Sequence, residues 1–212
     1  MKSSRREFLG AAAGLALAGS TKPEKIHAAN AGTNQIVNIY DNIVYEAGDA
    51  IPDWGFSAYI TYNGKTILFD AGTYPEIFKH NTTVFGVDLV AVDTVILSHN
   101  HMDHKGGLDY FLDAYEDYTL YLPNEWNIGG PFPTIFKKDG TYARGYSYRH
   151  RNTQYVIEHT EISNGIHIIA TESPIIGTSW GYPPHEEKPL FMGLPELSLA
   201  LENGTGQVIL IS

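Results

Sequence analysis

The sequence lacks cysteine, is poor in basic residues and has no long apolar run. The absence of Cys among 212 residues excludes disulfide scaffolds, thiol nucleophiles, thiolate zinc sites and iron–sulfur clusters. Any metal ion must therefore be bound by His, Asp or Glu. The 14 Lys and Arg against 24 Asp and Glu give a net charge of −10, which disfavours binding to nucleic acid or to an anionic membrane. No apolar stretch reaches the roughly 18–20 residues of a membrane span.

The composition is that of a folded domain. The sequence is 43% hydrophobic and 12% aromatic, which is ample for a packed core at this length. Disorder, collagen-like repeats and coiled coil are excluded. Because the protein is acidic, we expect its partner to be a small-molecule substrate rather than a polyanion.

The first 31 residues have the outline of an export signal. Arg5 and Arg6 precede a short, mildly apolar stretch rich in Ala and Gly, residues 8–19, and this order resembles the twin-arginine translocation signal. The resemblance implies a signal peptide over 1–31, a mature domain over 32–212, use of the twin-arginine export machinery, and a periplasmic or extracellular location. With no Cys to carry a lipid, no stable membrane anchor is expected. The alternative is a buried or amphipathic helix, which the glycines would weaken.

The mature region is predicted to begin with strands. Asn63-Gly64 is a hairpin turn signal, and the continuous apolar run at 92–97 indicates a strand buried on both faces. A helix is expected at 74–81, with Pro75 in its first turn and a connection over 82–89, and another helix at 108–115. The remaining expected strands are 35–40, 58–62, 65–69, 165–170 and 207–211.

Three histidines and an aspartate lie within six residues directly after the predicted strand at 92–97: His99, His101, Asp103 and His104. In an extended segment, His99 and His101 project to the same side, so both imidazoles can reach one ion at about 2.0–2.1 Å. Asp103 and His104 fall where the chain turns into a helix and can face a second ion. The alternative is a polar loop that is rich in histidine by chance.

Residues 98–107 resemble the His-x-His-x-Asp-His signature of the metallo-β-lactamase superfamily, and residues 68–72 resemble the strand end that carries an Asp before it. More narrowly, these segments, together with 54–57 and 85–89, resemble the subfamily of dihydropterin ribofuranosyl-aminobenzene phosphate synthase-like proteins. The resemblance implies an α+β fold, the αββα sandwich, here encoded mainly in its N-terminal half.

The resemblance also implies roles for the motif residues. His99 and His101 would bind the first of two divalent ions, and Asp103 and His104 the second, with Asp103 acting in catalysis by holding the nucleophile. Asp70 would orient the motif loop from behind, although it could equally be a strand-terminal Asp that satisfies a turn. With histidine and carboxylate ligands, zinc is expected, and iron or manganese fits the same set.

The chain departs from the family pattern after residue 211. In relatives, the corresponding strand runs into a turn that supplies a further metal ligand, and later segments supply a bridging acid and another His. We therefore expect a truncated domain with an incomplete second site. Two such chains could pair to complete one another's sheets, and the oligomeric state is left open.

Other candidate residues lie in the middle of the chain, within residues 121–189. His150 and Arg151 are a positive spot on an acidic protein and are candidates for contact with a substrate anion, or they belong to a solvated turn. His159, His167 and His185 are weaker candidates as replacement ligands. Residues 121–189 are rich in Gly, Pro, Tyr and Trp, either as an aromatic segment over the cleft or as a structural connection.

Two functions follow from these observations. The first is an exported metal-dependent hydrolase in which a metal-activated water attacks a small ester, lactone or phosphoester. The alternative is a truncated or degenerate, non-catalytic protein that binds metal weakly.

Overall fold

The computed structural model describes residues 33–43, 48–123, 134–136, 142–144, 152–173 and 194–211. The expected signal (1–31), His150, Arg151, His185 and most of the aromatic segment lie outside the described residues.

A mixed sheet of six strands forms the first half of the fold, in the order β1-β2-β3-β4-β5-β8. The first three strands pair antiparallel, and Asn63 and Gly64 join β2 to β3 with the positive φ angles of 46° and 79° that a tight hairpin requires. From β3 onward the strands run parallel, so their carboxyl ends meet at one edge. The strands are β1 Gln35–Tyr40, β2 Ser57–Tyr62, β3 Lys65–Phe69, β4 Thr94–Ile96, β5 Thr119–Pro123 and β8 Thr153–Val156.

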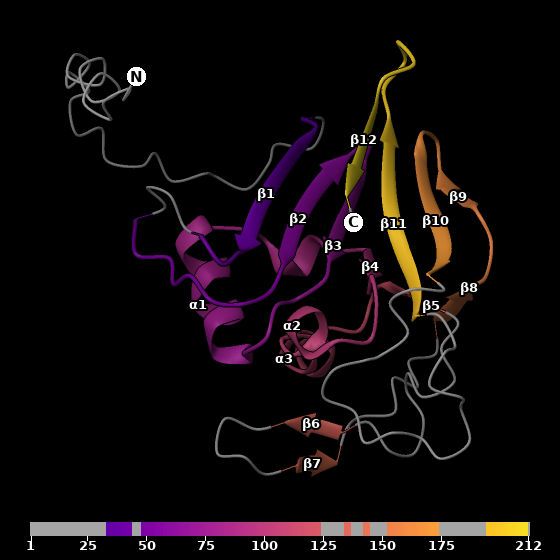
Figure 1. Ribbon diagram of the computed structural model, residues 1–212. Helices are drawn as coiled ribbons and strands as arrows, with labels where there is room; N and C mark the ends of the chain where they lie inside the picture. Colours follow the sequence, from indigo (N-terminus) through magenta and orange to yellow (C-terminus); the bar gives the residue numbers. More distant parts are fainter. Residues whose placement is uncertain are drawn as a thin grey trace, which may run out of the picture.

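A second sheet packs against the first. Its order is β12-β11-β10-β9, with every pair antiparallel. The two sheets stand side by side in Figure 1. The strands are β9 Thr160–Ser163, β10 Ile166–Ser173, β11 Leu194–Glu202 and β12 Val208–Ile211. A separate short ribbon pairs β6 Thr134–Phe136 with β7 Tyr142–Arg144.

Alternation along the strands divides the core into two clusters. Ile67 and Phe69 of β3 face the second sheet and pack with Ile168 and Leu199, whereas Leu68 faces the helices. The strand β4 is buried on both faces, as the apolar run predicts, although it is shorter than expected.

Three helices belong to the first sheet: α1 Pro75–Phe85, α2 Met102–Lys105 and α3 Leu108–Ala114. Phe78 of α1 and Phe111 of α3 pack on its outer face. Within the described residues, the layers are therefore helices, sheet and sheet. The predicted end of the first helix at 81 is wrong, because the helix continues to Phe85 and stops at Gly86, whose left-handed φ of 64° forms the cap. A short 3-10 turn, Leu89–Ala91, then leads to β4.

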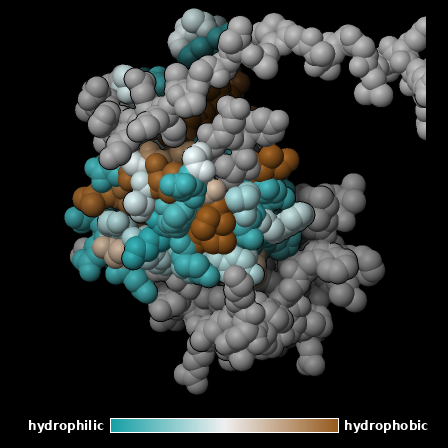
Figure 2. Space-filling model, turned by 90° about the vertical axis from the view of Figure 1, so that its left-hand side faces the viewer, coloured by the Kyte–Doolittle hydropathy of each residue, from teal (hydrophilic) through white to brown (hydrophobic). Residues whose placement is uncertain are grey.

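The face shown in Figure 2 is mostly hydrophilic, with hydrophobic residues in separate small groups. Among the described strands, β12 carries three exposed apolar residues, Val208, Ile209 and Leu210, each more than half exposed. None of the described helices is both long and apolar enough to span a bilayer.

Candidate metal centre

The motif residues lie at the carboxyl edge of the parallel strands. Asp70 follows β3 directly, and residues 98–101 follow β4 as an extended loop that enters α2. Because β3 and β4 are parallel neighbours, both segments leave the sheet at the same edge. This is the edge at which α/β sheets place their ligands.

Asp70 is fully buried and fixes the motif loop through hydrogen bonds. Its Oδ1 accepts a hydrogen bond from the Ser98 amide at 2.7 Å, and its Oδ2 lies 2.7 Å from both Ser98 Oγ and His104 Nδ1. The backbone at Asp70 is left-handed, with φ of 56°, a conformation that Asp tolerates better than most residues. The side chain therefore reaches both ends of the motif.

Glycines bring two backbone segments together, residues 71–73 and residues 104–107 at α2. Gly106 and Gly107 lie so close to Thr73 O and Ala71 O that a Cβ would stand 1.8 and 2.1 Å from those atoms. Backbone hydrogen bonds join the same segments, from Ala71 N to His104 O at 2.7 Å and from Gly107 N to Gly72 O at 3.2 Å. The tight approach fixes where α2 lies relative to Asp70.

The three imidazoles gather into one cluster. His99 Nε2 lies 2.9 Å from His101 Nδ1, and the rings of His99 and His104 are 4.1 Å apart between centroids. Ser98 Oγ contacts His99 Nδ1 at 2.9 Å, which leaves Nε2 of His99 facing its neighbour. His101 Nε2 is buried and has no hydrogen-bond partner.

Asp103 joins the cluster from the first turn of α2. Its Oδ2 lies 3.6 Å from His104 Nε2 and accepts a hydrogen bond of 2.8 Å from Trp54 Nε1. The backbone of the Trp54 loop is also attached to α2, through Phe56 N and Asp103 O at 3.1 Å. Sequence reasoning used Trp54 only as part of a resemblance and gave it no role, since nothing local in the sequence links it to Asp103.

The electrostatics keep two of the histidines neutral. Burial, with added repulsion from His104, His101 and Lys105, lowers the pKa of His99 to about 3. Burial also lowers the pKa of His101. Burial acts in the same direction on His104, but the hydrogen bond and charge of Asp70 outweigh it and raise the net pKa of His104. Neutral imidazole is the form that binds metal ions.

Lys105 and Glu196 are two further charged groups that sequence reasoning did not single out. Lys105 is only 3% exposed, and its Nζ donates to Asn100 Oδ1 at 2.5 Å. Glu196 of β11 contributes to the raised pKa of His104. It reaches the motif because Leu197 N donates to Ser98 O at 2.7 Å, a contact between segments about a hundred positions apart in the chain.

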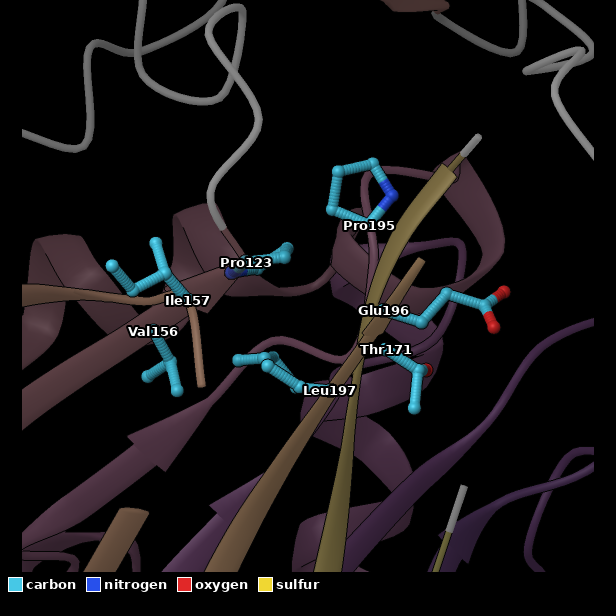
Figure 3. Close-up of a pocket in the computed structure, with 8 residues that line it drawn as sticks. Pro123, Val156, Ile157, Thr171, Pro195, Glu196 and Leu197 are labelled. Carbon is cyan, nitrogen blue, oxygen red and sulfur yellow. The ribbon is translucent and has the colours of Figure 1, made fainter. Parts of the chain in front are cut away.

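A pocket of about 150 Å³ lies next to the motif edge. Ends of strands from both sheets line it, including Pro123, Val156, Thr171 and Leu197. Figure 3 shows that the Glu196 carboxylate points away from Val156 and Pro123. Strand β11 thus lines the pocket with both an apolar side chain, Leu197, and an acidic one, Glu196.

The donor set fits a divalent transition metal. Two nitrogen ligands of a tetrahedral zinc, each about 2.0–2.1 Å away, stand about 3.3 Å apart, and the 2.9 Å between His99 Nε2 and His101 Nδ1 is close to this. The buried Nε2 of His101 has no hydrogen-bond partner, which is a second observation that favours a metal ion at this cluster. No set of three or more His, Asp or Glu in the described residues has the full arrangement of a metal site.

Comparison with known proteins identifies the family. The sequence profile of the metallo-beta-lactamase superfamily matches residues 52–191, more than half of the chain. The chain belongs to the metallo-beta-lactamase superfamily. Members of this superfamily are usually hydrolases and typically bind divalent metals such as zinc. The predicted superfamily and α+β fold class are thereby confirmed.

The relatives have several different activities. The chain is 37% identical over 86 residues to the 7,8-dihydropterin-6-methyl-4-(beta-D-ribofuranosyl)-aminobenzene-5'-phosphate synthase of Methanocaldococcus jannaschii, which covers 37% of this chain and 29% of the relative. It is 34% identical over 91 residues to the endoribonuclease ysh1 of Emericella nidulans, covering 42% of this chain and 10% of the relative. The chain therefore spans less than a third of the length of these relatives.

A solved structure shows the same fold. A crystal structure described as a metal-dependent hydrolase of the beta-lactamase superfamily matches with a TM-score of 0.53 and 20% identity, over 84% of this chain and 64% of that one. At this identity the match supports the fold alone.

Proposed function

We propose that this chain is an exported metal-dependent hydrolase, acting on a small ester, lactone or phosphoester. The observation that carries the proposal is the convergence of His99, His101, Asp103 and His104 at one sheet edge above the buried Asp70. Export rests on the likeness of residues 1–31 to a twin-arginine signal, which favours a periplasmic or extracellular location.

In this proposal, His99 and His101 bind one divalent ion, and Asp103 with His104 binds a second. Two such ions, zinc by default or iron or manganese, lower the pKa of a water molecule and stabilise the negative charge that develops on the attacked carbonyl or phosphoryl group.

The surrounding residues position the ligands. Asp70 accepts from His104 Nδ1 at 2.7 Å, which directs the opposite nitrogen, Nε2, toward Asp103. Such carboxylate–histidine contacts fix the tautomer and orientation of a metal ligand. Trp54 holds Oδ2 of Asp103, so this carboxylate is restrained from the opposite side and can keep the nucleophilic water in place.

The substrate is proposed to be small and at least partly apolar. The neighbouring pocket of about 150 Å³ is walled by both apolar and polar atoms, and its small volume suits an ester or lactone better than a polymer. His150 and Arg151 stay candidates for contact with an anionic group of the substrate. The acidic charge of −10 argues against a nucleic-acid substrate.

The test measures metal content and turnover together. The purified full chain is loaded with Zn²⁺, its metal is counted by mass spectrometry, and hydrolysis of bis(4-nitrophenyl) phosphate and of a simple lactone is followed with and without a chelator. We expect bound zinc, turnover that the chelator removes, and, in His101→Ala, loss of turnover together with a lower zinc content. The matched control is His80→Ala, because His80 lies on α1, outside the motif, and contacts Asp49 O at 2.7 Å.

The alternative is a non-catalytic metal-binding protein, and the same experiment separates the two. A zinc-loaded chain without turnover would overturn the hydrolase proposal and favour this alternative. For export, the intact mass of the protein from its host is decisive, since loss of about the first 31 residues is the expected result and a retained N-terminus contradicts it.

A further inference from the structure

A second pair of histidines lies on the outer face of the second sheet. His167 alternates with Ile166 and Ile168, which face the core between the sheets, so its side chain projects from the opposite face. His159 lies one residue before β9 begins. Its Nε2 stands 3.2 Å from His167 Nδ1, and the ring centroids are 5.2 Å apart.

The geometry of this pair matches that of the motif pair. In both pairs, Nε2 of the first histidine faces Nδ1 of the second, at 2.9 Å for His99 and His101 and at 3.2 Å for His159 and His167. Ligand nitrogens on a tetrahedral ion stand about 3.3 Å apart. The outer pair is therefore already at the spacing that one ion requires.

Two acidic residues lie beside His167, one in contact with it and one across the strand ladder. Glu202 Oε2 lies 3.6 Å from His167 Nε2, on the side opposite His159, so a proton held on Nε2 leaves the lone pair of Nδ1 available. Glu161 is the partner of His167 across the β9–β10 ladder, where a register shift between Ile166 and His167 marks a bulge. Bulges redirect side chains and occur next to sites.

We propose that His159 and His167 form a second, independent site for a divalent transition metal, in which Glu202 orients His167. Because the described residues contain no group of three or more such side chains arranged for metal, the site has two histidine ligands and is completed by water. The ion links the segment before β9 to β10 and so fastens the edge of the second sheet. Imidazole ligands favour Cu²⁺, Ni²⁺ and Zn²⁺, with Cu²⁺ bound most tightly.

The experiment uses Cu²⁺ as the probe and the full chain carrying His99→Ala, His101→Ala and His104→Ala, so that no motif histidine contributes. We expect one Cu²⁺ per chain, with a paramagnetic resonance spectrum that shows nitrogen coupling. Adding His167→Ala removes this copper, and adding Glu202→Gln weakens its binding about tenfold. Adding His80→Ala, the matched control, leaves it unchanged.

Two results would overturn the site. One is a folded background chain that binds no copper, which would mean that the histidines only share a hydrogen bond. The other is copper binding that His167→Ala does not alter. If circular dichroism shows that the background chain is unfolded, His167→Ala is instead introduced into the chain with an intact motif. This variant must then bind one copper ion fewer than the wild-type chain. A stoichiometry that does not change contradicts the proposal.

Discussion

The two histidine pairs have the same nitrogen-to-nitrogen arrangement in opposite surroundings. His99 and His101 lie in a loop fixed by a fully buried carboxylate and by glycine contacts. His159 and His167 lie on the outer face of a sheet, beside a Glu202 whose side chain is half exposed. What differs is the support behind each pair and not the spacing within it.

The rigidity of each site follows from the burial of the carboxylate behind it. A buried carboxylate that contacts the imidazole loses water on folding and must keep its partners, because an unpaired buried group is costly. An exposed carboxylate can exchange its partner for water. The motif pair is therefore expected to be preorganised, and the outer pair to be adjustable.

Removing the two supporting carboxylates tests the contrast most strongly. Asp70→Ala leaves the Ser98 amide, its hydroxyl and His104 Nδ1 without their shared acceptor, and we expect the free energy of unfolding to fall by about 3–5 kcal/mol. Glu202→Ala, its exposed counterpart, should cost about 0–1 kcal/mol. Urea unfolding followed by circular dichroism measures both, and equal losses would remove the distinction between the two settings.

Glycine substitutions test the tight packing around α2. Gly106→Ala places a Cβ 1.8 Å from Thr73 O, a backbone atom that cannot easily move, so overpacking should cost about 1–3 kcal/mol. The matched control is Gly204→Ala in the β11–β12 turn, where a Cβ meets nothing within 4 Å. Thermal unfolding should separate the two variants, and a Gly106→Ala protein as stable as the control would show that α2 can shift.

Trp54→Phe tests the support of a single ligand within the motif. The indole is 68% exposed but donates to Asp103 Oδ2, so its loss should cost only about 1 kcal/mol of stability. On the proposed function, zinc affinity should fall about tenfold, because an orienting contact is removed from a ligand. Competition with a chromophoric chelator measures the affinity. Unchanged zinc affinity would show that Trp54 does not orient Asp103.

The smallest effect concerns the helix-covered side of the first sheet. Burial, aided by the charges of Glu116 and Asp113, raises the pKa of Tyr118 to about 12. An unfolded Tyr loses its proton near pH 10, so the folded state loses stability as the pH rises from about 10 to 12. In Tyr118→Phe, this alkaline decline in the urea midpoint should be shallower. The exposed Tyr155→Phe serves as the comparison, and identical slopes would contradict the assignment.

The strands and the motif loop were predictable because their signals are local. The Asn63-Gly64 turn and the apolar run before Ser98 identify the β2–β3 hairpin and β4 directly, and four metal-binding residue types in six positions mark the motif. The end of α1 was missed because polar Thr82 and Thr83 are helical there, where their hydroxyls bond to Lys79 O.

The supporting contacts were not predictable, because they join distant parts of the chain. Nothing near Trp54 indicates that its indole meets Asp103, 49 positions away. The approach of Glu196 to His104 likewise depends on how β11 pairs with the rest of the second sheet. For Asp70, a resemblance suggested the role, and only the three-dimensional structure supplies the contacts with Ser98 and His104.

The hydrogen bonds between the two sheets affect the rate of folding. Tyr62 hydroxyl donates to Glu202 O across 140 positions, and Asn63 Nδ2 donates to Asn164 O across 101, while Leu197 N reaches Ser98 O at the opposite end. Contacts of such long range slow folding, because loop-closure entropy is lost before they form. During synthesis, the motif leaves the ribosome long before β11 does. The hydrogen bond between Leu197 N and Ser98 O can therefore form only after β11 has been synthesised.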